Sequence, residues 1–269
     1  MTIMMFSWIC LWTSFHIVYS LQCANNCSKS FSFGEPFVLP WNCSYISSYR
    51  CGVKILFWHE REKYVVTFPG DVFVDQINSD YSQFLMIETM ARTRFFSYEI
   101  NHLCKEQDDC GRMFAEKIIS REMARRFIKF SNLYVDLQRI LDRESMATKD
   151  LVCFDTNEVA RQCAIPGTIG SCQIIDDLTK LKLQRRSCQR NTHESASVNI
   201  YDSGSYAVMT VKCNRMLCNG PLTVEAVKNV LKHYNITDIN SRLPASSSHL
   251  SVRYFLLLIS LFFCAVLLK

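Results

Sequence analysis

The chain has 269 residues, of which 49% are hydrophobic and 20% charged, and its formal net charge is +5. This apolar content is typical of a globular protein and excludes a disordered stalk. Arg253 and Lys269 lie in the C-terminal tail, so the remainder carries about +3, which is too mild to indicate a nucleic-acid partner.

The first twenty residues have the character of a secretory signal peptide. Ile3–Trp12 is apolar and no charged residue occurs before Lys29, so only the usual basic n-region is missing. Val18-Tyr19-Ser20 places small or modest side chains before a cleavage point. We expect cleavage to leave Leu21 or the next residue as the first of the mature chain; the alternative is an uncleaved transmembrane anchor.

Fourteen cysteines indicate an oxidising compartment. Cys10 falls in the leader and Cys264 in the tail, which leaves an even number in between. A fully disulfide-bonded ectodomain requires an even number, and a cytosolic protein with free thiols is not expected to carry so many. The pairing cannot be deduced from sequence. The twelve expected to be bridged are Cys23, Cys27, Cys43, Cys51, Cys104, Cys110, Cys153, Cys163, Cys172, Cys188, Cys213 and Cys218.

Three glycosylation sequons agree with a secreted chain. They place acceptor asparagines at Asn26, Asn42 and Asn235. Cysteine occupies the middle position of the first two, which lowers acceptor efficiency. Asn235 is therefore the preferred site.

Residues 21–245 are predicted to form a disulfide-rich α+β ectodomain. Val53–Trp58 and Lys63–Phe68 are apolar runs joined by a charged four-residue turn, which predicts a β-hairpin. Gln83–Glu88 and Arg94–Ile100 predict two more strands that extend the hairpin into a four-stranded antiparallel meander.

Residues 110–142 are predicted to form one long amphipathic helix, or two if Ser131-Asn132 interrupts it. Asp108 or Asp109 would cap its start. A second helix is predicted near 223–234, with Thr223 as its N-cap. The apolar stripe of the first helix recurs at intervals of three and four residues: Ile119, Met123, Phe127, Phe130, Tyr134, Leu137 and Leu141.

The opposite face of this helix carries a basic row of four residues: Lys117, Arg121, Arg125 and Lys129. Like charges at this spacing repel by a few tenths of a kcal/mol per pair. One interpretation is contact with an anionic surface such as sulfated glycan or lipid headgroups. The other is a solvated helix face relieved by nearby glutamates.

The polar stretch 144–150 is the best candidate for a boundary between two lobes, because six ectodomain cysteines precede it and six follow. Short strands are predicted beyond it, and Asp202-Ser203-Gly204 marks a tight turn between the last two. No internal repeat is evident in the sequence. The predicted strands are Gln173–Ile175, Leu181–Leu183, Val198–Tyr201 and Tyr206–Val211.

The last stretch of the chain, 246–269, is predicted to be a membrane anchor. Tyr254–Leu268 is uncharged and almost wholly apolar, yet fifteen helical residues span only about 22 Å of the roughly 30 Å hydrocarbon core. Small residues at Ala245 and Ser246 and a short polar spacer favour a glycolipid-anchor signal. The alternatives are a short spanning helix, in which Arg253 reaches the headgroups, and a buried core helix.

Two short motifs resemble a known family. Leu21-Gln22-Cys23-(x3)-Cys27 and Cys213-(x4)-Cys218-Asn219 are similar to the opening and closing signatures of three-finger, urokinase-receptor-like surface domains. This resemblance implies a disulfide-bonded surface protein, often glycolipid-anchored, that binds partners rather than catalyses. It also implies a structural role for Asn219, because the closing asparagine of these domains ties the chain ends together.

Catalytic motifs are missing from the sequence. There is no G-x-S-x-G elbow, P-loop, G-x-G-x-x-G or C-x2-C pair, and His59-Glu60 is followed by Lys63 where a zinc protease needs histidine. We therefore expect no catalytic residues, no metal and no cofactor.

These features together predict a protein of the extracellular face of the plasma membrane. It is expected to be held there by its tail and to act by binding an unknown extracellular protein or glycan. An extracellular hydrolase with dispersed catalytic residues and a structural coat component are the alternatives.

Overall fold

The computed structural model describes residues 20–70, 79–89, 94–124, 130–142, 151–163, 170–180, 184–190 and 196–244. Its described residues divide into two compact units. Unit 1 holds those within 20–82 and 99–123, and unit 2 holds those within 83–98 and 124–244. The predicted signal peptide, the 144–150 boundary and the anchor segment with Ala245 and Ser246 lie outside the described residues.

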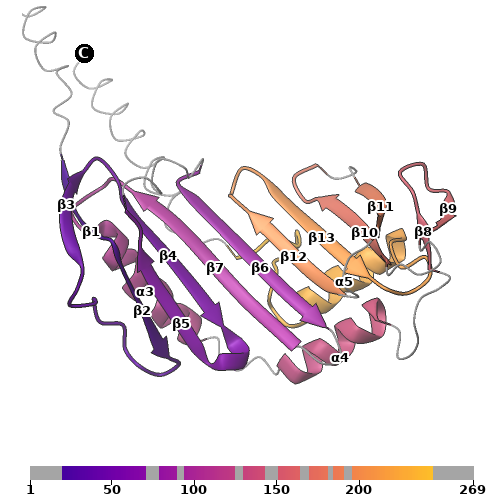
Figure 1. Ribbon diagram of the computed structural model, residues 1–269, viewed down its shortest axis with the longest axis horizontal. Coiled ribbons are helices and arrows are strands. Elements are labelled where there is room, and N and C mark those ends of the chain that lie inside the picture. The colour runs from indigo at the N-terminus through magenta and orange to yellow at the C-terminus, as the bar shows by residue number, and fades with distance from the viewer. Residues whose placement is uncertain are drawn as a thin grey trace, which may run out of the picture. The chain divides into compact units, whose positions relative to one another are not determined.

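Unit 1 contains one sheet, a separate two-stranded ribbon and one helix (Figure 1). In the ribbon, β1 pairs with β3 in antiparallel register, with Leu21 opposite Ser48. The strand order of the sheet is β7-β4-β5-β2, to which β7 contributes residues 99–104. The element bounds are β1 Leu21–Asn25, β2 Cys27–Ser32, β3 Ser44–Ser48, β4 Cys51–Trp58, β5 Lys63–Phe68, β7 Arg94–Cys104 and α3 Cys110–Ala124.

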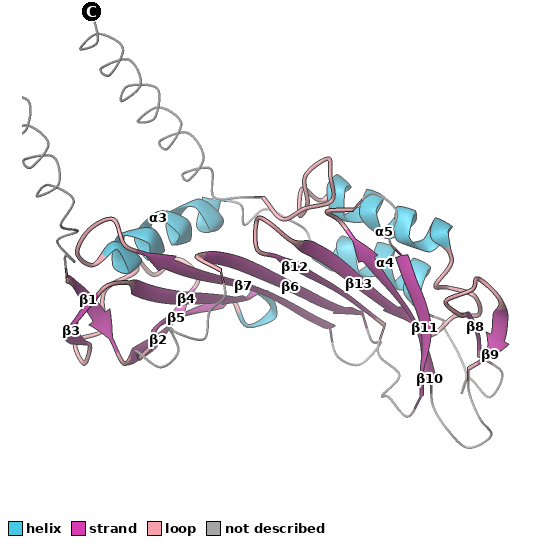
Figure 2. Ribbon diagram, turned by 90° about the horizontal axis from the view of Figure 1, so that it is seen from above, coloured by secondary structure: helices cyan, strands magenta, loops and turns pink. Residues whose placement is uncertain are grey.

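The predicted hairpin is confirmed as β4 and β5, with Phe57 opposite Tyr64. Alternate side chains of these strands are fully buried, because one face of each strand packs into the core. The predicted meander is wrong: the second edge of β5 pairs with β2, so β5 has no free edge for the strand that follows it. Helix α3 lies along one face of this sheet (Figure 2).

Unit 2 contains a larger sheet of strand order β11-β10-β13-β12-β6-β7, to which β7 contributes residues 94–98. The short β8–β9 hairpin forms a separate two-stranded ladder, and β8 contacts β10 and β11 of the larger sheet. Every strand pairing recorded here is antiparallel. The bounds are β6 Tyr81–Thr89, β8 Val152–Phe154, β9 Ala160–Gln162, β10 Gly170–Asp177, β11 Gln184–Arg190, β12 Ser197–Asp202, β13 Ala207–Cys213, α4 Phe130–Leu141 and α5 Pro221–His233.

The core of unit 2 lies between its sheet and two helices. Alternate residues of β12 and β13, such as Ile200 and Met209, are fully buried, as are Leu137 of α4 and Val227 of α5. The two helices lie side by side, and the Tyr234 hydroxyl donates to Asp136 across them at 2.8 Å (Figure 2). The predicted strands near 173–175, 198–201 and 206–211 are confirmed, and 181–183 lies outside the described residues.

The helix predictions are met in part. The 110–142 stretch contains two helices, α3 and α4, and residues 125–129 between them are not described. The stripe residues Ile119, Tyr134, Leu137 and Leu141 are buried; the side chains of Met123, Phe127 and Phe130 lie outside the description. None of the helices in the described part of the chain has both the length and the apolar character needed to cross a membrane.

The C-terminal helix α5 begins two residues earlier than predicted. Its N-cap is Gly220 rather than Thr223, and Pro221 occupies the first helical position. Proline is suited to that position because its fixed φ matches the helix and its missing N–H would have no partner there.

All twelve cysteines expected to be bridged form disulfides. The pairs are Cys23–Cys51, Cys27–Cys43, Cys104–Cys110, Cys153–Cys172, Cys163–Cys188 and Cys213–Cys218. Three bonds precede residues 144–150 and three follow, and none joins the two sets. The fold is therefore a disulfide-rich α+β fold with locally closed bridges.

The order of elements repeats along the chain, although the sequence shows no repeat. Each half has three successive strand pairs: β1/β3, β4/β5 and β6/β7 in the first, and β8/β9, β10/β11 and β12/β13 in the second. In each half a disulfide joins the opening strand to the first strand of the second pair. A short disulfide, Cys104–Cys110 or Cys213–Cys218, then starts at the end of the third strand pair and leads into a helix.

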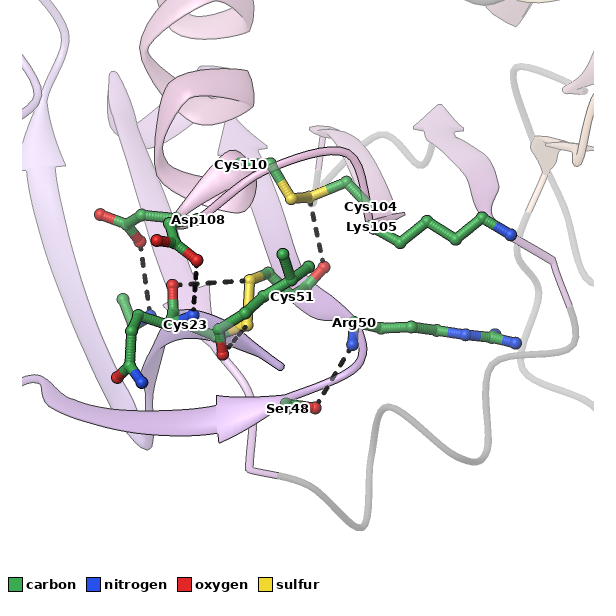
Figure 3. The surroundings of a disulfide bond; sticks show 12 residues. Cys23, Ser48, Arg50, Cys51, Cys104, Lys105, Asp108 and Cys110 are labelled. Atoms are coloured by element: carbon green, nitrogen blue, oxygen red, sulfur yellow. Dashed lines mark hydrogen bonds between the residues drawn. A yellow bond between two sulfur atoms is a disulfide. The ribbon is translucent and has the colours of Figure 1, made fainter. Parts of the chain in front are cut away.

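In the first half, the closing loop binds the opening strand through backbone and carboxylate groups (Figure 3). The Gln22 N–H donates to Asp108 Oδ1 at 2.9 Å, and the Asp109 N–H donates to the Gln22 carbonyl at 2.8 Å. The Ala24 N–H donates to Asp109 Oδ1 at 3.4 Å. Both carboxylates therefore contact β1, and Asp109 also directly precedes α3, where its carbonyl accepts from the N–H groups of Arg112 and Met113. The Cys23–Cys51 and Cys104–Cys110 bridges pack beside them with Leu21.

In the second half, the closing loop binds its opening strand through one buried amide. Asn219 has an exposed fraction of 0%. Its Oδ1 accepts from the Phe154 N–H at 2.9 Å, and its Nδ2 donates to the Phe154 carbonyl at 2.8 Å and the Gln173 carbonyl at 3.2 Å. A single side chain thus joins β8 and β10 to the end of the third strand pair.

The last described residues are docked on unit 2. Arg242 forms a bidentate ion pair with Asp202, with Nη2–Oδ1 at 2.5 Å and Nε–Oδ2 at 3.0 Å, and it donates to the Gly204 carbonyl at 2.7 Å. Asp202 is only 3% exposed, and Leu243 is buried too. The hydrogen bond with Asp202 raises the pKa of Arg242. The chain is therefore fixed to the β12–β13 turn as far as Leu243.

We predict that Asn219→Ala lowers the free energy of unfolding by about 2 to 4 kcal/mol, because it leaves the buried Phe154 amide and carbonyl without partners. Thermal unfolding of the oxidised protein, followed by circular dichroism, measures the loss. Asn240→Ala is the matched control, because Asn240 is exposed on the same unit; its change should stay within about 0.5 kcal/mol. Equal midpoints for the two variants would contradict the structural role of Asn219.

Candidate interaction surface

The most exposed aromatic side chain in the described structure is Trp41, at 95%. Val38, Tyr45 and Tyr49 in the same stretch are each more than half exposed. We call these four residues the 38–49 surface. It lies on the loop that enters β3, on β3 itself and just after it.

Local structure keeps these side chains outside the core. The Cys27–Cys43 bridge and the hydrogen bond from the Cys43 N–H to the Pro40 carbonyl, at 3.2 Å, constrain the loop. Phe37, four residues before Trp41, packs inward with its ring centroid 5.7 Å from that of Phe31. Among the described strands, β3 pairs only with β1 in a two-stranded ribbon. The ribbon itself therefore cannot cover the side chains that point outward from β3.

Polar contacts orient part of the 38–49 surface. The Tyr45 hydroxyl donates to Asp109 Oδ2 at 3.2 Å, and the Arg112 guanidinium Nε lies 2.6 Å from the same oxygen. Partial burial and then the neighbouring Asp109 carboxylate raise the pKa of Tyr45, so the phenol remains a hydrogen-bond donor at neutral pH. The Arg50 guanidinium lies 5.3 Å from the centre of the Tyr49 ring.

This surface has the composition of a protein-binding hot spot. Trp, Tyr and Arg dominate the binding energy of interfaces, since each combines a large apolar area with a polar group. Contiguous exposed apolar patches mark interaction sites, and these four exposed side chains lie within twelve positions of the sequence. This surface is absent from the predictions made above, although the sequence carries a signal for it. Aromatic residues recur at every fourth position: Phe33, Phe37, Trp41, Tyr45 and Tyr49.

The predicted glycosylation sites are all accessible. Asn26, Asn42 and Asn235 are exposed in the structure. Asn42 directly follows Trp41, so a glycan there would lie within the 38–49 surface.

The predicted anionic contact row is only partly described. Lys117 is exposed on α3. Arg121 forms an ion pair with Glu122 at 3.0 Å, so its charge is balanced locally. Arg125 and Lys129 lie outside the described residues.

The described cysteines and histidines that could serve catalysis or metal binding are engaged in disulfides or in contacts with aromatic rings. Cys104 and Cys110 lie near Glu106 but are bonded to each other, so they offer no thiolate to a metal. His59, His102 and His233 lie on different elements, and each packs against an aromatic ring: Phe33, Phe114 and Tyr234 respectively.

Neither a scan against models of protein families nor a search of curated proteins finds a match for this chain.

Proposed function

We propose that this protein is an extracellular receptor-like or ligand-like binding protein, held at the outer face of the plasma membrane, which engages a partner protein through the 38–49 surface. The observation that carries this proposal is the exposure of Trp41, together with that of Val38, Tyr45 and Tyr49 in the same stretch of chain. Burying such side chains against a partner removes apolar area from water at roughly 25 cal/mol per Å². No catalytic step is needed for this role.

The compartment follows from three features that have independent causes. The leader is a sequence signal for secretion, the tail is a sequence signal for lipid attachment, and the six disulfides need an oxidising environment. We favour a glycolipid anchor attached near Ala245 or Ser246 over a short spanning helix, because the fifteen apolar residues Tyr254–Leu268 are short for a membrane span and follow small residues and a polar spacer.

We further propose that the chain holds two three-finger-like modules in tandem. Each half has three strand pairs, a bridge from the opening strand to the second pair, and a short closing bridge. The contacts of Asn219 with Phe154 agree with the chain-joining role that the family resemblance implies for this asparagine. Helices α3, α4 and α5 have no counterpart in such a module and would be additions to it.

A glycan partner is the main rival, because aromatic faces also pack on sugar rings. The charges next to the 38–49 surface favour a protein partner over a sulfated glycan. The described structure places two guanidinium groups beside this surface, and both are balanced by carboxylates. Arg50 lies over Tyr49 and 3.8 Å from Asp80, and Arg112 pairs with Asp109 and Glu116.

We predict that Trp41→Ala weakens binding about 30-fold, since a central interface tryptophan contributes about 2 kcal/mol or more. Cells that display the full chain would be mixed with cells that do not, and conjugates counted by flow cytometry. Leu222→Ala is the matched control, because Leu222 is similarly exposed but lies on α5 of unit 2. Conjugates lost after trypsin treatment of the target cells support a protein partner. Loss only after glycosidase treatment would support the glycan, and equal binding by the two variants would refute the surface.

We predict that phosphatidylinositol-specific phospholipase C releases the protein from intact cells into the medium. Immunoblotting of cells and medium before and after treatment measures the released fraction. Retention on the treated cells would instead support the spanning helix. Recovery in the soluble fraction without any treatment would refute the tether.

A further inference from the structure

The two Asn-Cys-Ser sequons meet at a single disulfide. Asn26 directly precedes Cys27 and Asn42 directly precedes Cys43, and these two cysteines are bonded to each other with 4.9 Å between their Cα atoms. Both asparagines are exposed, so the folded chain has room for a glycan at each. One covalent bond therefore fixes the middle residue of both acceptor sequons.

The third residue of each sequon is also held by the fold. Ser28 pairs with Thr67 in the β2–β5 ladder, and their hydroxyls are 2.8 Å apart. Ser44 pairs with Asn25 in the β1–β3 ladder and donates to its carbonyl at 3.1 Å. An acceptor segment must enter a transferase active site with its sequon hydroxyl available. Once the bridge and both ladders exist, that requires local unfolding.

The third sequon lacks this constraint. In Asn235-Ile236-Thr237 no thiol is present, although Thr237 is buried in the folded protein. Transfer at Asn235 therefore competes with folding but with no disulfide. This difference provides an internal control within one chain.

We propose that glycan transfer to Asn26 and Asn42 competes with closure of the Cys27–Cys43 disulfide, and that the outcome at Asn42 sets whether the 38–49 surface is open or covered. The second part rests on the function proposed above; the first part does not. The chain would then leave the secretory pathway in two forms. In one form a glycan next to Trp41 shields the aromatic side chains, and in the other they are free to bind.

The two competing reactions consume different groups of the same sequons. In glycan transfer, the asparagine amide nitrogen bonds to the anomeric carbon of a lipid-linked oligosaccharide, the lipid pyrophosphate leaves with the electron pair, and one amide proton is lost. In bridge closure, the two thiols lose two protons and two electrons to the disulfide of an oxidoreductase, which becomes a dithiol. Because the bridge and its two ladders hold the sequon serine hydroxyls in hydrogen bonds, whichever reaction is faster decides occupancy.

The test measures occupancy of each asparagine by mass spectrometry, in the full chain made by secretory cells with and without a short pulse of dithiothreitol. We expect reduction during synthesis to raise occupancy at Asn26 and Asn42 at least twofold and to leave Asn235 unchanged. An equal rise at all three sites would mean that general delay of folding is the cause, and no rise at any site would also overturn the proposal.

Two single substitutions separate the bridge from the chemistry of the sequon. Cys43→Ser leaves Asn26-Cys27-Ser28 intact but removes the partner of Cys27, so occupancy at Asn26 should rise at least twofold. Cys27→Ser should do the same for Asn42. Cys153→Ser removes a bridge that holds no sequon and should change neither site. These readouts need no folded product, because occupancy is measured on the chain whether or not it completes folding. Unchanged occupancy at Asn26 in Cys43→Ser would refute the competition.

The covering of the surface is tested in the conjugate assay. Asn42→Gln removes the glycan beside Trp41 and should raise conjugate formation by at least the factor set by occupancy at Asn42, so half occupancy gives a twofold rise. Asn235→Gln should have no effect. Higher occupancy without any change in binding would overturn the covering while leaving the competition in place. If no variant, nor the unaltered chain, forms conjugates, the proposed function fails and the occupancy results still decide the competition.

Discussion

Each half of the chain depends on a polar contact between its last loop and its first strand. In the second half this contact is the Asn219 amide, which satisfies both the N–H and the carbonyl of Phe154. In the first half the same task is divided between the Asp108 carboxylate and the Asp109 backbone, which bind the N–H and carbonyl of Gln22. Backbone groups at the edge of a short strand are costly to bury without partners, so these contacts allow the opening strand to join the core.

Each half needs its own closing contact because no disulfide joins the two ends of a half. No bridge spans more than 28 residues of sequence, and the two closing bridges span 6 and 5. Bridges over such short loops limit the unfolded chain only locally, each by about 2 to 4 kcal/mol in the loop-entropy model. Non-covalent contacts must therefore join the ends of each half. Glycines accompany both closures: a Cβ on Gly111 or Gly220 would lie 3.3 Å from a backbone carbonyl oxygen.

Local sequence patterns were sufficient to predict individual strands and helices, but not which strands pair with one another. Alternation of apolar residues predicted β4 and β5, and helical spacing placed Leu137 and Leu141 on a buried face, because both signals depend only on nearby residues. The pairing of β5 with β2 was not predictable in this way, since Cys27–Ser32 shows no strong alternation and gains its order from its partner strand. The closing role of Asp108 likewise depends on a strand 86 residues away.

The candidate surface was missed for a related reason. The sequence does not distinguish the aromatic residues between Phe33 and Tyr49, and only the structure separates Phe37, which packs on Phe31, from Trp41, which is exposed. The four-residue spacing was a usable signal, because it suits neither a strand nor a long helix in a stretch with two prolines. The pairing of Asn26 with Asn42 through one bridge could not be known before the disulfide connectivity was.

The ion pair of Arg242 with Asp202 has a mechanical consequence for a lipid-held protein. Because the chain is fixed to the β12–β13 turn as far as Leu243, an anchor attached near Ala245 or Ser246 would follow the fixed part within three residues, which reach at most about 11 Å when fully extended. The β12–β13 turn of unit 2 would then lie close to the lipid headgroups and could move only a short distance away from them. Breaking that one ion pair would lengthen the tether and allow unit 2 to lie farther from the membrane.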